Sequence, residues 1–583
     1  MTAAATTTAL ALVAGLLLVT TAAVSAQQAV ERHLPAAGAA PTDALSIAAP
    51  DYGRSDEAPL GVDLAGIRLI GAGQDVASGT SRGVTLHGVT GLPAATVETA
   101  LAPYLGAPLS LGLITRLQAD IAALWRNAGY PFMSVTVPPQ EVTTGVLTLR
   151  VVEFVAGPAV TVTGDADASL ATNVRITPGQ RVDARALSED MAWLNRNPYR
   201  IVNGQFAPGS AFGTTDLTLK VTAEKPFSVS AGYGNTGSVA TGLDRWSIGG
   251  GIWVPVLNDM IVSYRFTRGS DIFTGGDLFA LDASRAGYLS HAGRIDLPTL
   301  PRQALSIAPN YVATNELLAG LPISFANQTF ELPILYRSAV SNLIPEAYWG
   351  DFYFGIEPKW FRRSTALSGT EIASGEAGLV NFVVGWSHQL ADPYGRTAID
   401  ARLKFNPGGI IAGNDAATWA AFTGGRVTDP TYVLAGLDVT RSTNLPQDFA
   451  WISQFSGLAA NQALPDSERL SLAGFGAVRG YDAGDGSVDT GLVWRNELRT
   501  PVLTPLAGAG LADSLSPFIF ADLGTGYDFA TAAQTTLASA GVGFDYAIGS
   551  NFTASAVGAV ALRDAPQTRA GDFSFTTDLR LSY

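Results

Sequence analysis

The length, composition and charge of this chain exclude several classes of protein. Its 583 residues are 47% hydrophobic and only 15% charged, with 63 glycines, no cysteine and a net charge of −14. Soluble domains average about 25% charged residues, so this composition is not that of an ordinary soluble protein. The pI of about 4.8 and the scattered basic residues oppose nucleic-acid binding. The absence of cysteine excludes disulfides and thiolate metal ligands.

Only the N-terminus offers an apolar run near the roughly 20 residues that a membrane-spanning helix needs. Ala9–Val19 is followed by small residues and by Val24-Ser-Ala26, which is typical of a signal peptide cleaved after Ala26. No lysine or arginine precedes the run, so an uncleaved anchor is the alternative interpretation. We therefore predict a signal peptide at residues 1–26 and export of the rest. Residues 27–63 are rich in alanine and proline, which predicts a tether.

Residues 64–155 are predicted to form a small α+β module. Val84–Val89 is typical of a strand and Thr96–Tyr104 of a short helix. Apolar residues at helical spacing predict a second helix that is buried on one face: Ile114, Leu117, Ile121, Leu124 and Trp125. Strands at Phe132–Val137 and Val146–Phe154 complete a β-α-α-β-β order.

Residues 156–225 repeat that order in a shorter form. Val160–Val162 predicts a strand, and Asp183 can cap the helix that follows. The apolar face of this helix comprises Leu187, Met191 and Leu194. Pro198 ends the helix, and Arg200–Phe206 predicts the next strand. The last strand carries Leu217, Leu219 and Val221 on one face.

Residues 226–583 change to the period of two that strands have. In the last eleven residues one face is mostly apolar and the other is polar. The first face carries Phe573, Phe575, Thr577, Leu579, Leu581 and Tyr583; the second carries Ser574, Thr576, Asp578, Arg580 and Ser582. Met260–Thr267 and Leu492–Arg499 alternate similarly. A strand of a soluble sandwich would look alike, but lipid tolerates only helices and closed barrels. We predict an antiparallel membrane β-barrel, long enough for about 14 to 18 strands.

The chain offers no constellation for catalysis or for a cofactor. Its four histidines, His33, His87, His291 and His388, lack metal-ligand spacing. We therefore expect a protein that is not an enzyme and that has no metal and no cofactor.

One arginine stands in a run of small residues, Phe475–Gly484, which reads FGAVRGYDAG. A glycine-rich loop with a cation can cradle a phosphate. This stretch lacks the G-x-x-x-x-G-K-[ST] pattern and the strand-to-helix setting of such loops. The alternative is a buried structural pin, which we favour.

Short motifs along the chain, specific by their order and spacing, resemble those of two-partner secretion outer-membrane transporters, the haemolysin secretion and activation family. They are Pro139-Gln140, Gly145–Glu153, Val182–Leu187, Trp193–Pro198, Thr215–Leu217 and Gly232–Ser238. The similarity runs from about Val84 to Tyr583. It implies two POTRA domains, at residues 64–155 and 156–225, followed by a 16-stranded barrel at residues 226–583.

The resemblance also implies a partner for the arginine. In this family and its barrel-assembly relatives, a Val-Arg-Gly-Phe/Tyr motif at the tip of a lumenal loop meets the acidic residue of a Phe-x-Asp motif on the wall. The matching residues are Val478, Arg479, Gly480, Tyr481, Phe520 and Asp522. Parity supports this, because Asp522 shares a face with Phe520, opposite Ile519, and an ionised carboxylate is costly in lipid. We expect Tyr481 to pack on the wall with its hydroxyl in water. The pair could instead serve only to stabilise the barrel.

The function implied is export of a large secreted partner protein, captured by POTRA domains in the periplasm and passed through the barrel of a monomer in outer-membrane lipid. The POTRA modules could instead be spacers. A plug helix, common in the family, is an alternative for residues 27–63, although Pro35 and Pro41 interrupt Ala29–Leu34. An insertase for barrel proteins, from the same superfamily, and a passive porin are the alternative functions.

Overall fold

The computed structural model describes residues 52, 56–76, 81–130, 132–165, 168–211, 213–273, 287–318 and 321–583. The predicted signal peptide, and most of the tether or plug predicted at residues 27–63, lie outside the described residues. The described residues before Pro226 form one compact unit and those from Pro226 onward form another. No described helix has the length and hydropathy that crossing a membrane requires.

The first module is a four-stranded sheet covered by two helices. Its elements are β1 (Pro59–Asp63), β2 (Gly66–Ile70), β3 (Gly83–His87), α2 (Ala94–Leu101), β4 (Pro108–Ser110), α3 (Leu111–Asn127), β5 (Met133–Thr136) and β6 (Val146–Glu153). The sheet order is β3-β2-β6-β5, and β1 pairs with β4. The tether predicted at residues 27–63 therefore ends before Pro59. The predicted helices and later strands are confirmed, and the apolar stripe of α3 packs in the core, where Leu117, Ile121 and Trp125 are fully buried.

The sequence-based order omitted β2, which is the central strand beside β3 and β6. All five of its residues are buried, and it runs parallel to both neighbours. A strand buried on both faces lacks the alternation of apolar and exposed polar residues that marks a half-buried strand. In β2 the buried Arg68 also interrupts the apolar residues, so the sequence shows neither an alternating pattern nor a continuous apolar run.

The second module has β10 at its centre. Its elements are β7 (Val155–Ala156), β8 (Thr161–Gly164), α4 (Ala184–Leu194), β9 (Arg200–Pro208) and β10 (Thr214–Ala223). β10 pairs with β9 in antiparallel fashion and with β7 and β8 in parallel. The predicted cap is confirmed, because the Asp183 carboxylate accepts hydrogen bonds from the first turn of α4.

Polar and aromatic contacts join the two modules. The Arg181 guanidinium lies 2.7 Å from the Glu153 carboxylate, which also accepts a 2.8 Å hydrogen bond from the Trp125 indole. The rings of Phe132 and Phe206 lie 4.0 Å apart, centre to centre. The modules therefore pack against each other directly.

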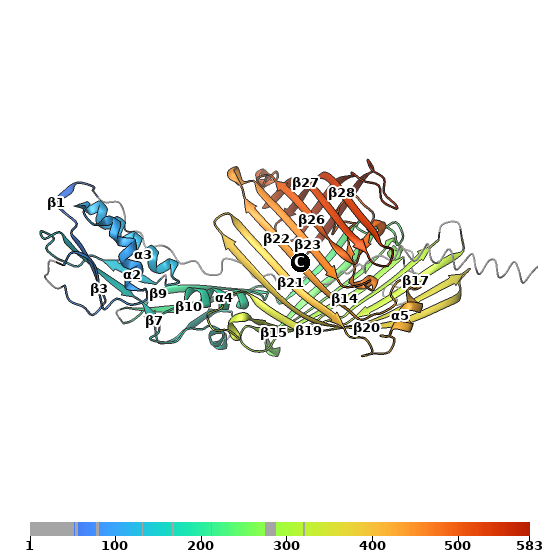
Figure 1. The fold of residues 1–583 in the computed structure, drawn as a ribbon, viewed down its shortest axis with the longest axis horizontal. Helices are drawn as coiled ribbons and strands as arrows, with labels where there is room; N and C mark the ends of the chain where they lie inside the picture. The colour runs from blue at the N-terminus through green and yellow to red at the C-terminus, as the bar shows by residue number, and fades with distance from the viewer. Residues whose placement is uncertain are drawn as a thin grey trace, which may run out of the picture. The chain divides into compact units, whose positions relative to one another are not determined.

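From Pro226 onward the chain forms a closed antiparallel barrel (Figure 1). Its segments are β11 (Phe227–Gly234), β12 (Arg245–Val254), β13 (Met260–Arg268), β14 (Tyr288–Pro298), β15 (Gln303–Ile307), β16 (Asn310–Leu317), β17 (Ile323–Glu331), β18 (Ile334–Ala339), β19 (Asp351–Leu367), β20 (Thr370–Asp392), β21 (Gly395–Asn406), β22 (Tyr432–Asn444), β23 (Ala450–Ala460), β26 (Thr490–Arg499), β27 (Asp513–Asp528), β28 (Ala533–Ile548), β29 (Phe552–Ala561) and β30 (Phe573–Ser582).

Two of the strands are interrupted by proline. β15 and β16 both pair with β14, and they are halves of one strand broken at Pro309. β17 and β18 both pair with β19 and are broken at Pro333. Proline lacks the N–H that the ladder uses, so it splits a strand locally. Counted this way, the described residues form 16 strands, which confirms the predicted fold.

The two faces of the barrel wall differ as the sequence predicts. On β30, Phe573, Phe575, Leu581 and Tyr583 are exposed on the outside. On β27, Ile519 is 56% exposed, whereas Phe520 and Asp522 are buried. β30 closes the barrel by pairing with β11 from Ser230 to Gly234. The outer face is therefore apolar and the inner face carries the charges.

Two long loops leave the same end of the barrel, the end away from Phe227. We call residues 407–431 the α5 loop, because it contains the helix α5 (Ala416–Phe422), and residues 461–489 the lumenal loop. The lumenal loop contains the short hairpin formed by β24 (Leu470–Ser471) and β25 (Ser487–Val488). Its apolar residues pack on inner-face residues of the wall, among them Val493, Leu537 and Ala561. The loop therefore folds back into the barrel.

Candidate functional site

The tip of the lumenal loop carries the predicted arginine. The Nε of Arg479 lies 2.7 Å from Oδ2 of Asp522, and its Nη2 donates to Oδ1 of the same carboxylate at 2.8 Å. The Arg479 amide also points at Asp522, at 3.3 Å. Arg479 is only 3% exposed. A bidentate, fully bonded pair of this kind is the arrangement in which burial of two charges is tolerated.

Phe520 supports the pair from one side. The guanidinium carbon of Arg479 lies 3.7 Å from the centre of the Phe520 ring. A cation stacked on a ring at this distance is stabilised by the ring quadrupole. The Phe-x-Asp motif of the wall therefore contacts the arginine through both of its named residues.

The neighbouring tip residues fit the wall closely. Val478 is fully buried, and a Cβ placed on Gly524 of β27 would lie 2.8 Å from its Cγ2 atom. Gly480 has a φ of +94°, and a Cβ there would lie 3.1 Å from the Cβ of Ala559. Glycine tolerates this backbone conformation and this close approach, whereas residues with a Cβ do so at a cost. The two glycines, one on each partner, let the tip lie flat on the wall.

The expectation that the Tyr481 hydroxyl stays in water is wrong. The hydroxyl oxygen lies 2.8 Å from the backbone carbonyl oxygen of Ala538, to which it donates, and 3.0 Å from the carbonyl oxygen of Arg563. It also accepts a 3.0 Å hydrogen bond from the Arg563 amide. It thus joins β28 to the loop after β29. The backbone groups of Arg563, just past the end of β29, and the carbonyl of Ala538 replace water as partners of the hydroxyl.

Sequence reasoning missed Glu497 as a second partner of Arg479. Its Oε1 atom accepts a 2.6 Å bond from Nη1 of Arg479, and its Oε2 atom accepts one at 2.7 Å from Arg499. Arg499 continues to Asp545 at 2.6 Å. Alternation along Leu492–Arg499 puts Glu497 on the polar face, but only the register of β26 and β27 brings it opposite Phe520. Opposite charges therefore alternate along the inner wall.

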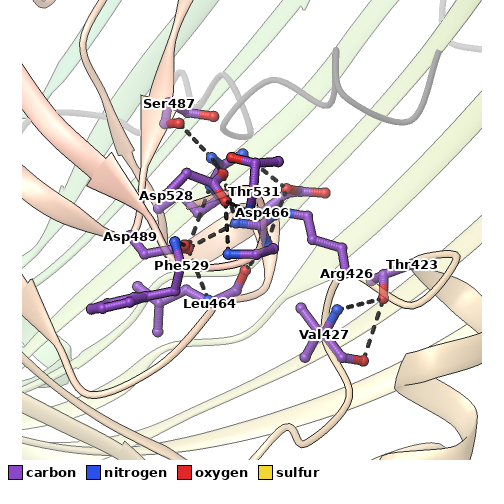
Figure 2. Close-up of polar contacts among 12 residues, drawn as sticks. Thr423, Arg426, Val427, Leu464, Asp466, Ser487, Asp489, Asp528, Phe529 and Thr531 are labelled. Carbon is purple, nitrogen blue, oxygen red and sulfur yellow. Dashed lines mark hydrogen bonds and ion pairs between the residues drawn. The ribbon is translucent and has the colours of Figure 1, made fainter. Parts of the chain in front are cut away.

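A second ionic cluster, which we call the root cluster, holds the two ends of the lumenal loop (Figure 2). It comprises Arg426, Asp466, Arg469, Asp489 and Asp528. Arg426 comes from the α5 loop and lies 2.8 Å from Asp489 and 3.4 Å from Asp528. Arg469 pairs with Asp528. The cluster thus links the α5 loop, both ends of the lumenal loop and the end of β27.

Asp489 is the centre of the root cluster. It is fully buried, and its carboxylate accepts hydrogen bonds from the backbone amides of Leu464, at 2.9 Å, and Phe529, at 2.8 Å. Asp466 is held less well, since its Oδ1 atom is buried without a hydrogen bond. Burial raises the pKa of the Asp466 carboxyl, and the nearby Arg426 and Arg469 oppose that rise.

A third contact ties the lumenal loop to another part of the wall. Glu468 pairs with Lys359 of β19 and lies 3.6 Å from Lys404 of β21. Lys359 also lies 3.2 Å from Glu331, and Lys404 lies 2.6 Å from Glu357. Lys359 and Glu468 are almost completely buried. Two lysines and three glutamates therefore alternate in this cluster.

The positions of these contacts show that the loop crosses the barrel. Glu468 binds β19, which is the seventh of the 16 strands, and Gly480 approaches Ala559 of β29, which is the fifteenth. Strands that are eight apart in a closed barrel of 16 lie on opposite walls. The lumenal loop therefore spans the lumen from one side to the other.

The same loop also contacts two further loops at this end of the barrel. The Asp482 carboxylate accepts a 2.7 Å bond from the amide of Val239, in the loop after β11. Asp485 accepts a 2.6 Å bond from the amide of Gln567 and one from the Thr568 hydroxyl, in the loop after β29. Within the described residues, no group of His, Asp and Glu is placed to hold a metal ion. The acidic residues of the loop serve as acceptors for neighbouring loops.

Comparison with known proteins agrees with this architecture. Residues 352–546 match the model of the haemolysin secretion/activation protein family ShlB/FhaC/HecB, and residues 80–153 match the ShlB-type POTRA domain. The outer membrane transporter CdiB-2 of Burkholderia pseudomallei (strain 1026b) is 24% identical over 392 residues, which cover 64% of this chain. The match spans 62% of the length of that relative.

Solved structures share the fold. CdiB from Escherichia coli superposes with a TM-score of 0.65 at 16% identity, covering 92% of this chain and 94% of that one. CdiB from Acinetobacter baumannii gives 0.56 at 16% identity and covers 91% of each chain. The chain is therefore similar to the ShlB/FhaC/HecB haemolysin secretion/activation proteins over residues 352–546 and to their POTRA domain over residues 80–153. These matches and the transporter CdiB-2 identify an outer-membrane β-barrel transporter with a periplasmic POTRA region.

Proposed function

We propose that this protein exports a large partner protein from the periplasm to the cell surface through the lumen of its barrel. The observation that carries the proposal is the lumenal loop, which crosses a barrel preceded by two POTRA-like modules and is pinned to the wall by Arg479 and Asp522. A polar inner wall suits the passage of an unfolded chain, whose backbone must stay hydrogen-bonded. Since β30 closes on β11 of the same chain, we also propose that a monomer is sufficient.

The second module offers an edge for cargo capture. β10 occupies one side of β9, and no other described strand pairs with the opposite side. Part of that free edge is covered by Asn195. Its side chain donates to the carbonyl of Val202 at 2.8 Å and accepts from the Val202 amide at 2.7 Å.

Alternation along β9 then predicts which backbone groups remain free. Outward-pointing positions recur every second residue in an antiparallel strand, so Gly204 and Phe206 point the same way as Val202. We propose that an extended segment of the cargo adds to the sheet there. Asn195 would limit that addition to the far end of the edge, which also restrains unwanted pairing.

A proline at Gly204 tests this capture site. It removes one outward N–H and leaves the bonds of β9 to β10 in place. We expect Gly204→Pro to weaken binding of the N-terminal secretion domain of the cargo to the soluble periplasmic unit, measured by titration calorimetry. Gly204→Ala is the matched control and should bind normally. Equal binding by both variants would reject β9 as the docking edge.

At the tip, we propose that Arg479 and Asp522 hold the lumenal loop in the position that transport requires. The alternative is a purely stabilising role. The two differ in one respect: the first predicts a barrel that assembles normally and exports poorly when the pair is broken. Folding of the cargo at the surface opposes its return.

Comparison of cells with and without this gene tests the function as a whole. Proteins of the culture medium and of the outer membrane are measured by mass spectrometry. A dedicated exporter predicts loss of one large protein from the medium, with other outer-membrane barrels unchanged. General loss of barrels would instead identify an insertase, and no change in either fraction would favour a passive porin.

A further inference from the structure

Besides the contact of Glu468 with Lys359, the lumenal loop is held at its tip and at its root by contacts of different strength. At the tip, the Arg479 pair is bonded on both carboxylate oxygens and sits among apolar residues, including Val478 and Phe520. At the root, Oδ1 of Asp466 and Nε of Arg469 are buried without hydrogen bonds. Buried groups left without partners lower the net stability of a cluster. The root is therefore the part that can release first.

The residue that closes the root comes from outside the lumenal loop. Arg426 binds the carbonyl of Leu464, at the start of the loop, and Asp489, at its end. It therefore clasps the two ends together and ties them to the α5 loop. Among the described residues of the α5 loop, Arg426 is the one that forms ion pairs with the aspartates of the root cluster.

The α5 loop is itself firmly attached to the wall. The Trp419 indole donates to the carbonyl of Gly378 at 2.9 Å, and the ring is buried against Phe361 and Leu379. Asp415 caps α5 through the Thr418 amide, a bond that lowers the pKa of its carboxyl. Paired amides of Asn406 and Asn414 close the base of the loop. Arg426 is thus presented by a rigid support.

We propose that Arg426, by holding the two ends of the lumenal loop to the α5 loop, keeps the outer mouth of the pore closed in the resting protein. We call this contact the latch. Release of Arg426 lets the root of the lumenal loop move away from the α5 loop while the tip stays docked through Arg479. The loop then stays attached to the opposite walls through Glu468 and Gly480, but its two ends are no longer held to the α5 loop. The inference rests on the proposed export function for its purpose, but pore conductance tests it without any cargo.

The test uses the full-length protein in planar lipid bilayers. Arg426→Gln removes the charge that both ends of the loop share, and we expect the open probability of the pore to rise about tenfold. The matched control is Arg441→Gln, since Arg441 also pairs with an aspartate, Asp392, but on the wall at the periplasmic end. Unchanged opening in Arg426→Gln, or an equal rise in the control, would overturn the latch.

A cross-link provides a second test that does not depend on how well one variant folds. The chain has no cysteine, so Arg426→Cys with Asp466→Cys introduces its only two thiols. We expect this variant to conduct when reduced and to close again when a short bis-thiol reagent joins the two residues. Conduction that persists after complete cross-linking would contradict the proposal.

Export assays separate this inference from the proposed function. A wild-type chain that exports no protein, combined with a latch effect on conductance, would reject the exporter and retain the latch. Normal export by the wild type, with no conductance change in Arg426→Gln, would retain the exporter and reject the latch.

Discussion

The tip and the root of the lumenal loop both bury arginines against carboxylates inside a barrel, but they hold these charges in different ways. At the tip one arginine is bonded by Asp522 and Glu497 and stacked on Phe520, with glycines that allow close packing. At the root two arginines share three aspartates, and some of their atoms lack hydrogen bonds. Apolar packing around satisfied charges fixes a position, whereas charges held mainly by one another form a contact that can be broken.

The largest effect is expected from reversal of either charge at the tip. Arg479→Asp or Asp522→Arg leaves like charges in contact in a buried site, and loss of a buried partner costs about 3–5 kcal/mol. We expect export to fall to background while the barrel still assembles. Cargo in the medium is measured by immunoblot, and barrel folding by heat-modifiable mobility on gels.

The outcome decides between positioning and stability at the tip. Arg441→Asp, at the exposed pair with Asp392, is the control for a general charge effect. If both tip reversals export at the wild-type level, the anchor has no part in transport. If the barrel fails to assemble, the pair is only structural.

A smaller effect is expected from a single methyl group at the tip. Gly480→Ala places a Cβ at a φ of +94° and 3.1 Å from Ala559. The left-handed backbone alone costs about 1–2 kcal/mol, so we expect export to drop about tenfold. Gly476→Ala is the control in the same loop, because a Cβ there meets nothing within 4 Å. Similar export by the two variants would show that close docking of the tip is unimportant.

The pair at the tip was predicted from the resemblance to the family, because Arg479 lies in its loop motif and Asp522 in its wall motif. Local sequence provided support only, since the parity of Phe520 and Asp522 along one strand places the aspartate on the inner face. What parity could not supply was the register between strands, which decides that Glu497 also reaches the arginine. The alternating strands of the barrel were predictable for the same local reason.

The root could not be predicted, because its members are distant in the chain. Arg426 is separated from Asp489 by 63 positions and from Asp528 by 102. No period or motif relates these residues, since their meeting depends on how two loops fold over one end of the barrel. The strand β2 was missed for a different reason: its five buried residues show no alternation.

An effect of intermediate size tests how far export and the position of the loop tip depend on the Tyr481 hydroxyl. Tyr481→Phe keeps the ring but leaves the Arg563 amide without its 3.0 Å acceptor. An unsatisfied buried group costs about 1–3 kcal/mol, so we expect about a fivefold loss of export. The position of the loop is read from maleimide labelling of Gly476→Cys, the only thiol in that variant. If Tyr481→Phe shows wild-type export and labelling, the attachment of the tip to the wall depends on Arg479 and not on the Tyr481 hydroxyl.

The smallest expected effect is that of salt on the open probability of the pore, because salt screens the ion pairs of the root more than those of the tip. Two side chains of the root, Asp466 at 13% and Arg426 at 11%, are more exposed than the pair at the tip, Arg479 at 3% and Asp522 at 0%. Asp489 of the root is fully buried, and Glu497 of the tip is 11% exposed. Screening acts on exposed charges, and the Debye length falls from about 8 Å at 0.15 M salt to about 3 Å at 1 M.

We therefore expect 1 M salt to raise the open probability of the wild-type pore by about twofold, the scale of a partly exposed ion pair. Arg426→Gln should show no such rise, because its latch is already broken, and export-deficient Gly480→Ala should respond like the wild type. Open probability is used, since conductance itself grows with the salt of the bath. A salt response of equal size in Arg426→Gln would place the screened contact elsewhere in the lumen, because the root would then contribute nothing that salt can weaken.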